Sequence, residues 1–229
     1  MAQRYFVPTL PDGGRLPLDA ELAHHVGRVL RTRPGELLRL GDGAGATADA
    51  VVVAVDRHRV EVEIRARRQA PPPSPRVLLA FAPPRLQRAE WLLEHGTEVG
   101  VDRFQPLWTA RTRPQGERLE RWHKIVRAAA GQCDRAWLPT LAPAMELASF
   151  LAGPLPADRL VGGLGAPPLS THRATGATAL LVGPEGGFTP EELAAIAGAG
   201  FVPRSFGPHT LRTETAAVVG AAILLAAAG

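Results

Sequence analysis

Two short segments near the C-terminus contain residue types that suit a small-molecule site. The first, 180–192, reads LLVGPEGGFTPEE, and the second, 206–217, reads FGPHTLRTETAA. Each segment follows the pattern of a buried strand, a Gly/Pro loop and the beginning of a helix. Ligands of open α/β sheets bind outside the carboxyl ends of the strands. If the two strands are neighbours, their loops therefore predict one shared site.

The first loop is rich in residues that control backbone conformation. Glycines at 183, 186 and 187 allow the backbone to approach a ligand closely and to take positive φ angles. Residues 189–192, Thr-Pro-Glu-Glu, are typical of a helix start, with an N-cap, a proline at the first position and two acids in the first turn. A tight turn into a helix, without any ligand, would explain the same pattern.

The loop lacks the motifs of phosphate-binding sites. Neither Gly-x-Gly-x-x-Gly nor Gly-Lys-Ser/Thr is present. The acidic side chain of Glu185 would repel a phosphate, but it suits a cationic ligand or sugar hydroxyls. A sulfonium such as S-adenosylmethionine meets both descriptions.

The second loop places Arg212, Thr213, Glu214 and Thr215 directly before a helix that has almost no charge. Thr213 or Thr215 would cap this helix, and Glu214 would complete a capping box. Capping does not explain Arg212, because a cation beside the positive end of a helix dipole is unfavourable. We therefore interpret Arg212 as a functional residue.

A proline-rich segment divides the chain into two predicted domains. Four of the residues 70–75 are prolines, which interrupt helices and central strands and make a semi-rigid spacer. Alternating apolar and polar residues before it predict a small β-barrel of about 70 residues. Strands alternate with helices after it, which predicts a mostly parallel sheet covered on both faces. Asp19 is the predicted N-cap of a first helix, whose apolar face would be Leu22, Val26, Val29 and Leu30. The predicted strands are 4–7, 36–40, 47–55, 59–67, 77–82, 104–107, 160–164, 179–182 and 201–206, and the other predicted helices are 86–99, 117–130, 191–199 and 213–228.

Composition limits the classes of protein to consider. The 229 residues are 45% hydrophobic, which supports a packed core, and the single cysteine, Cys133, excludes an internal disulfide and favours the cytoplasm. We expect no signal peptide, and the apolar run 216–228 is too short for a typical membrane span, so a membrane partner is not predicted. No metal site is predicted either. Residues 1–150 contain 22 basic and 17 acidic residues, whereas residues 151–229 contain four and five. A basic surface outside the two loops suits contact with nucleic acid.

The two loops together resemble the RsmE family of bacterial methyltransferases, which act on N3 of a uridine in small-subunit (16S) ribosomal RNA. The resemblance is carried by 183–187 (GPEGG) and 211–216 (LRTETA), and weaker matches lie at 24–31 and 97–101 and at Gln132, Arg135 and Pro139. His95, Ala110 and Gly131 depart from the residues usual in the family. Membership implies a SPOUT methyltransferase domain with a C-terminal trefoil knot, residues 71–229, preceded by a PUA-like β-barrel for RNA binding, residues 1–70.

The resemblance also implies a homodimer and the cofactor S-adenosylmethionine. The cofactor would lie between the two loops, and a third loop near Leu164 would close over it. The implied cofactor-binding residues are Leu164, Gly183, Pro184, Glu185, Gly186, Gly187, Phe206, Gly207, Leu211, Thr213, Thr215 and Ala216.

The implied reaction needs help mainly at its acceptor atom. The sulfonium is already a strong electrophile, but uridine N3 carries a proton at neutral pH. Arg212 is our candidate for contacting a uracil carbonyl and favouring the anionic base, and Glu214 or Glu185 would accept the proton. Candidate contacts to RNA phosphates are Arg28, Arg31, Arg33, Arg111, Arg113 and Arg135.

Three hypotheses for the function remain from the sequence. The first is the ribosomal RNA uridine-N3 methyltransferase. The second is a SPOUT enzyme that acts on a different RNA or base atom. The third is a non-catalytic RNA-binding module that has kept the fold. Cofactor binding separates the third hypothesis from the other two.

Overall fold

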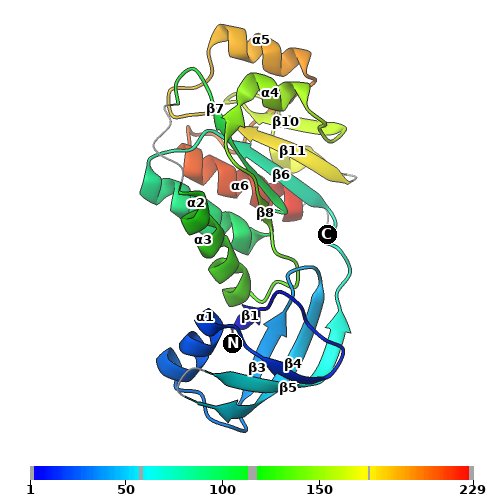
Figure 1. The fold of residues 1–229 in the computed structure, drawn as a ribbon. Coiled ribbons are helices and arrows are strands. Elements are labelled where there is room, and N and C mark those ends of the chain that lie inside the picture. The colour runs from blue at the N-terminus through cyan, green and yellow to red at the C-terminus, as the bar shows by residue number, and fades with distance from the viewer. Residues whose placement is uncertain (1–2, 57–58, 113–117, 175, 227–229) are drawn as a thin grey trace. The chain divides into compact units, whose positions relative to one another are not determined.

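The computed structural model describes residues 3–56, 59–112, 118–174 and 176–226 and contains two compact units. Unit 1 comprises residues 1–72 together with 127–138, and unit 2 comprises residues 73–126 and 139–229 (Figure 1). The chain therefore returns to unit 1 for twelve residues after unit 2 has begun.

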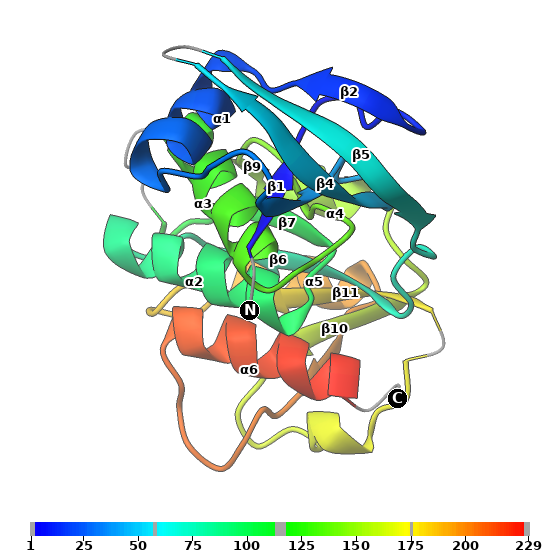
Figure 2. The same ribbon diagram turned by 90° about the horizontal axis from the view of Figure 1, so that it is seen from below.

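Unit 1 is built on a curved five-stranded sheet of order β1-β3-β4-β5-β2. Strands β1 and β3 pair in parallel and all other pairs are antiparallel, and the long hairpin of β4 and β5 is well seen in Figure 2. Every second residue of β4 between Ala46 and Val52 is buried, so the predicted alternation is confirmed. The elements are β1 (Arg4–Phe6), β2 (Gly14–Pro17), α1 (Ala20–His24), a π-helical turn η1 (His25–Val29), β3 (Leu37–Gly41), β4 (Ala46–Val55) and β5 (Val60–Gln69).

The N-terminal helix differs from its prediction in one respect. Asp19 caps it as expected, accepting a hydrogen bond of 2.8 Å from the amide of Leu22. The predicted apolar face is wrong beyond Val26, because Val29 and Leu30 are 58% and 45% exposed. The turn His25–Val29 is a π-helix, which adds a residue to the turn and moves later side chains off the face that a 3.6-residue period predicts.

Residues 127–138 are held in unit 1 by a carboxylate between two arginines. Asp134 pairs with Arg4 and with Arg39, each at an N–O distance of 2.9 Å. Burial lowers the pKa of Arg4, while attraction to the Asp134 carboxylate opposes this shift. A half-buried carboxylate thus compensates the buried guanidinium of the first strand.

Unit 2 alternates strands and helices, as predicted. Helix α2 has the predicted bounds, and the predicted start of α3 at residue 117 lies outside the described residues. Strands β8 and β9 and helix α4 are too short to leave a periodic pattern and were not predicted. The elements are β6 (Arg76–Phe81), α2 (Leu86–Val99), β7 (Arg103–Trp108), α3 (Leu119–Gln132, continuing into unit 1), β8 (Thr140–Leu141), β9 (Met145–Glu146), α4 (Leu147–Ala152), β10 (Asp158–Gly162), a 3₁₀ turn η2 (Leu169–Thr171), β11 (Ala177–Val182), α5 (Pro190–Gly198), β12 (Val202–Arg204) and α6 (Thr213–Ala226).

The sheet of unit 2 has the order β12-β10-β11-β6-β7-β8, and each of its described strand pairs is parallel. Successive residues of β6 face opposite layers: Val77, Leu79 and Phe81 pack with residues of α2, α3 and α6, whereas Leu78 and Ala80 pack with residues of α4 and α5. Figure 1 shows these two groups of helices on the two faces of the sheet. Helices α2 and α6 lie side by side in the layer that also contains α3 (Figure 2). The predicted cover of helices on both faces is confirmed. Within the described ranges, no helix has the length and apolar character needed to cross a membrane.

The fold of unit 1 predicts a strong effect of adding one methyl group at Gly131. A Cβ atom built there would overlap the backbone carbonyl oxygen of Arg4. We expect Gly131→Ala to lower the free energy of unfolding by roughly 1–3 kcal/mol, measured by chemical denaturation. Gly198→Ala is the matched control, because its Cβ meets nothing within 4 Å. Equal stability of the two variants would contradict the close approach at Gly131.

Candidate functional site

Three loops meet at the carboxyl ends of β10, β11 and β12. These strands are parallel neighbours in the sheet, so their ends share one edge. The loops enclose a pocket of about 410 Å³, within the size range of small-molecule sites. It is lined by Gly162, Gly163, Leu164, Val182, Gly183, Pro184, Glu185, Gly187, Phe188, Leu193, Ser205, Phe206, Gly207, His209, Thr210, Leu211, Thr213 and Ala216.

A hydrogen bond joins the two loops that the sequence singled out. The hydroxyl of Thr213 donates to the carbonyl oxygen of Gly183 at 3.0 Å, within a part-buried environment. The carbonyl of Arg212 accepts from the amide of Ala216 at 2.7 Å, so α6 begins at this point. The first turn of α6 is therefore attached to the end of β11.

The loop after β11 closes on itself and continues into a capped helix. The amide of Gly187 donates to the carbonyl of Pro184 at 2.8 Å, and the φ of Gly187 is 71°, a conformation that favours glycine. Thr189 and Glu192 form the predicted capping box, with bonds of 2.9 and 3.2 Å. The pKa of the neighbouring Glu191 carboxyl is lowered by a hydrogen bond with the Glu191 backbone and by one with the Thr189 side chain.

The loop after β7 contacts the loop after β11 and the beginning of α5. Its Ala110 amide donates to the second carboxylate oxygen of Glu192 at 2.7 Å. The guanidinium of Arg111 donates to the carbonyl of Gly186. Gly186 is thus turned toward Arg111, which agrees with its absence from the pocket lining. The sequence alone did not indicate this contact.

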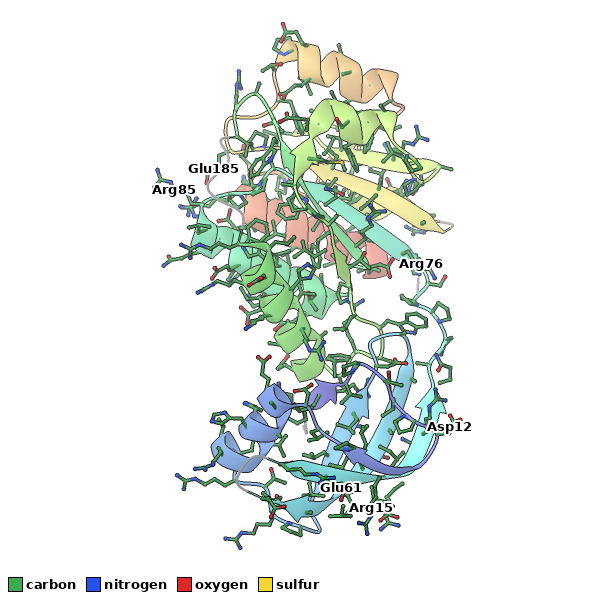
Figure 3. The ribbon with its side chains drawn as sticks, in the orientation of Figure 1. Asp12, Arg15, Glu61, Arg76, Arg85 and Glu185 are labelled. Carbon is green, nitrogen blue, oxygen red and sulfur yellow. The ribbon has the colours of Figure 1, made fainter. Side chains whose placement is uncertain are left out.

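Arg88 connects the two carboxylates that were predicted as alternative proton acceptors. Its guanidinium donates to Glu185 Oε1, and its Nε lies 3.6 Å from Glu214 Oε1. Figure 3 shows Glu185 beside the beginning of α2, which the label of Arg85 marks. The Glu214 side chain is only 10% exposed, and its buried Oε2 atom finds no hydrogen-bond partner within the described ranges. The sequence did not indicate a role for Arg88, because no motif near residue 88 predicts that its side chain contacts Glu185 and Glu214.

Most of the predicted cofactor-binding residues line the pocket, and both predicted catalytic residues lie outside its lining. Gly186, Thr215, Arg212 and Glu214 are the predicted residues that do not line it. Arg212 is exposed, whereas Glu214 is buried. The lining residues that were not predicted are Gly162, Gly163, Val182, Phe188, Leu193, Ser205, His209 and Thr210. Most are chain neighbours of predicted ones, so wider segments around the same motifs would have included them.

The chemistry of the lining fits a neutral or cationic ligand. None of the described residues that line the pocket is lysine or arginine, and Glu185 is the one carboxylate among them. An anionic phosphate would find no lysine or arginine among these residues, whereas a sulfonium with an adenosine group would find backbone carbonyls, apolar side chains and one acid. Within the described residues, no group of three or more His, Cys, Asp or Glu side chains is arranged to hold a metal ion.

The predicted RNA-contacting arginines fall in both units. Arg28, Arg31 and Arg33 are exposed in unit 1, while Arg135 is half-buried there and donates to the carbonyl of Trp137 at 3.2 Å. Arg111 lies in unit 2, and Arg113 falls outside the described residues.

Comparisons with known proteins agree with both units. A family model of an RNA methyltransferase domain matches residues 71–225, and a model of an RNA methyltransferase PUA domain matches residues 18–65. The chain is 36% identical to ribosomal RNA small subunit methyltransferase E of Mycobacterium tuberculosis, over 96% of this chain and 89% of the relative. The relative of the same name from Synechocystis is 34% identical, over 87% and 69% of the two chains.

Solved structures show the same fold. The Neisseria gonorrhoeae ribosomal RNA small subunit methyltransferase E, bound to S-adenosyl methionine, has a TM-score of 0.90 at 30% identity, covering 97% of this chain and 96% of the other. A Legionella pneumophila protein in complex with the cofactor SAM has a TM-score of 0.91 at 30% identity, covering 100% and 99%.

The bond between the loops predicts the behaviour of a threonine variant. Thr213→Val keeps the shape of the side chain but removes the donor to Gly183. Loss of one part-buried hydrogen bond costs about 1–2 kcal/mol, so we expect S-adenosylmethionine to bind roughly tenfold more weakly in calorimetry. The control is Thr171→Val. The Thr171 hydroxyl donates to the carbonyl of Pro168, the residue before η2, and Thr171 does not line this pocket. Equal loss of affinity in both variants would show that the bond between the loops does not shape the pocket.

Proposed function

Since the chain belongs to the ribosomal RNA small subunit methyltransferase E family, we propose that it transfers a methyl group from S-adenosylmethionine to N3 of a uridine in small-subunit (16S) ribosomal RNA. The observation that carries the proposal is the pocket between the loops after β11 and β12. Its lining contains no lysine or arginine within the part of the chain that the structure describes, and Glu185, one of the lining residues, connects it to Arg88 and Glu214. The related structure with S-adenosyl methionine bound supports this choice of cofactor.

The cofactor would be held by the residues that surround the pocket. Gly183, Gly187 and Leu211 offer backbone groups to an adenine edge, and Leu164 and Phe206 offer apolar surface to its ring. When bound, the cofactor supplies a methyl group on a positively charged sulfur. The chain itself then has to place the acceptor in line with that methyl group.

The acceptor would lie at the first turn of α6, outside the lining of the cofactor pocket. Arg212, the residue before α6, is exposed, and its guanidinium makes no hydrogen bond or ion pair among the described residues, so it is available for a uracil carbonyl. Such a contact stabilises the negative charge that develops on the base when N3 loses its proton. Glu185 and Glu214 are the nearby carboxylates for that proton.

RNA binding would use the exposed arginines of unit 1. The exposed Arg28, Arg31 and Arg33 suit phosphate contacts, and the exposed Val29 and Leu30 between them suit contact with an unstacked base. We also keep the predicted domain bounds, with residues 1–70 for RNA binding and 71–229 for methyl transfer. The homodimer, the trefoil knot and action in the cytoplasm remain parts of this proposal, as does contact of Arg135 and Arg111 with RNA.

A deletion strain provides the direct test of the reaction. Nucleosides from its small-subunit ribosomal RNA should lack 3-methyluridine by mass spectrometry, and the intact gene should restore it. Unchanged 3-methyluridine would reject the proposed reaction in favour of a different RNA or base.

Arg212 provides a test within the chain. Arg212→Ala should lower the methylation rate by about 100-fold or more, since it removes a cation from the developing negative charge, while cofactor affinity stays within about threefold. Arg76→Ala is the control, because Arg76 starts β6 and so lies at the opposite edge of the sheet (Figure 3). An unchanged rate in Arg212→Ala would remove Arg212 from the mechanism.

Salt dependence tests the arginines of unit 1. Replacing Arg28, Arg31 and Arg33 by alanine should reduce the slope of log affinity against log salt concentration by about 2, at about 0.7 per phosphate contact in single-stranded RNA. A matched triple variant replaces Arg15, Arg59 and Arg65, which are exposed in unit 1 but paired with Glu61 or Glu63. If both variants change the slope equally, net charge alone explains the binding.

A further inference from the structure

We propose that Arg88 is a positioning residue, anchored by Glu185, that orients Glu214 as the group that takes the proton from uridine N3. This inference rests on the proposed methyl transfer and deepens it at one point, the identity of the proton acceptor. It also gives a role to an arginine that lies outside both loop motifs.

The contacts of Arg88 connect three separate parts of unit 2. Arg88 lies in the first turn of α2, Glu185 in the loop after β11, and Glu214 in the first turn of α6. One guanidinium faces both carboxylates, through a hydrogen bond to Glu185 and an ion pair at 3.6 Å with Glu214. An arginine fork can hold two carboxylates at fixed directions, which a flexible lysine does less well.

The two carboxylates differ in environment, and the difference separates their roles. The Glu185 side chain is 58% exposed and accepts the hydrogen bond from Arg88. The Glu214 side chain is 10% exposed, and its Oε2 has no hydrogen-bond partner among the described residues. Leaving a buried charged oxygen unpaired costs more free energy than leaving a neutral group unpaired, so such an atom needs an explanation. We infer that the acceptor N3–H supplies the missing partner.

The charges around Glu214 also fit this role. Among the described residues, Arg88 from α2 forms an ion pair with Glu214 and also contacts Glu185, and Arg212 comes two residues before Glu214, directly before α6. Arg88 and Glu185 compensate each other, which leaves the Glu214 carboxylate as the proton acceptor. Arg212 remains available for the uracil carbonyl.

The resulting step is balanced in atoms and charge. The proton on N3 passes to Glu214 Oε2, and the nitrogen electron pair forms the new bond to the methyl carbon. The bond between that carbon and sulfur breaks, and its electron pair stays on sulfur. A cationic sulfonium and an anionic carboxylate thus become a neutral thioether and a neutral carboxylic acid, which afterwards releases its proton to water.

The test measures single-turnover methylation and cofactor affinity in a set of variants. Glu214→Gln should lose at least 100-fold in rate, in the range expected for removal of a general base. Arg88→Met should lose about 10-fold or more while its affinity for S-adenosylmethionine stays within about threefold, since Arg88 does not line the pocket. Arg88→Lys should recover part of the rate. Arg121→Met is the control, because it removes the ion pair between Arg121 and Glu90 of α2, which lies away from the loops.

A double variant tests whether Glu185 acts through Arg88. If it does, Arg88→Met combined with Glu185→Gln is no slower than Arg88→Met alone. If the losses of methylation rate from the two substitutions multiply instead, Glu185 acts independently of Arg88 and the proposed order of contacts is overturned. A Glu185→Gln variant as slow as Glu214→Gln would also overturn it. An Arg88→Met variant that loses rate, cofactor affinity and thermal stability together would show a structural role and overturn the inference. A wild-type chain that binds the cofactor but does not methylate uridine would overturn the proposed function itself, and this inference with it.

Discussion

The hydrogen bond from the Thr213 hydroxyl to the Gly183 carbonyl is the contact on which the candidate site depends. It fixes the first turn of α6 to the carboxyl end of β11. Helix α6 packs against β6, β11 and α2, so this attachment also sets the position of Glu214 relative to Arg88. The pocket and the charged cluster beside it are therefore two consequences of one anchored helix start.

Carboxylates connect the loops around that anchor. Glu192 caps α5 with one oxygen and accepts the Ala110 amide with the other, and Glu185 holds Arg88. Each of these two carboxylates accepts a hydrogen bond from a distant part of unit 2. Glu214 differs from them, because one of its oxygens is buried and has no hydrogen-bond partner in the described part of the chain. Because the other two carboxylates already accept hydrogen bonds, the buried oxygen of Glu214 is the atom best suited to accept a proton.

The parts of the fold that were predicted correctly are those with local signals. Helix α2 has a long apolar period, and Thr189 with Glu192 forms a capping box within four residues. Strand β2 and the short elements β8, β9 and α4 were missed because they contain two to six residues, too few to show a period. The exposure of Val29 and Leu30 was missed because a π-helical turn interrupts the period on which the prediction relied.

The sequence by itself determined the alternation of strands and helices, the two glycine- and proline-containing loops, and the family that their motifs resemble. These features depend on residues close together in the chain, where propensity and spacing are visible. Only the tertiary structure decided that the loops after β10, β11 and β12 enclose one pocket, that Arg111 contacts Gly186, and that Arg88 lies between Glu185 and Glu214. Arg88 is 97 residues from Glu185, and no local pattern marks a contact made by the packing of separate strands and helices against one sheet.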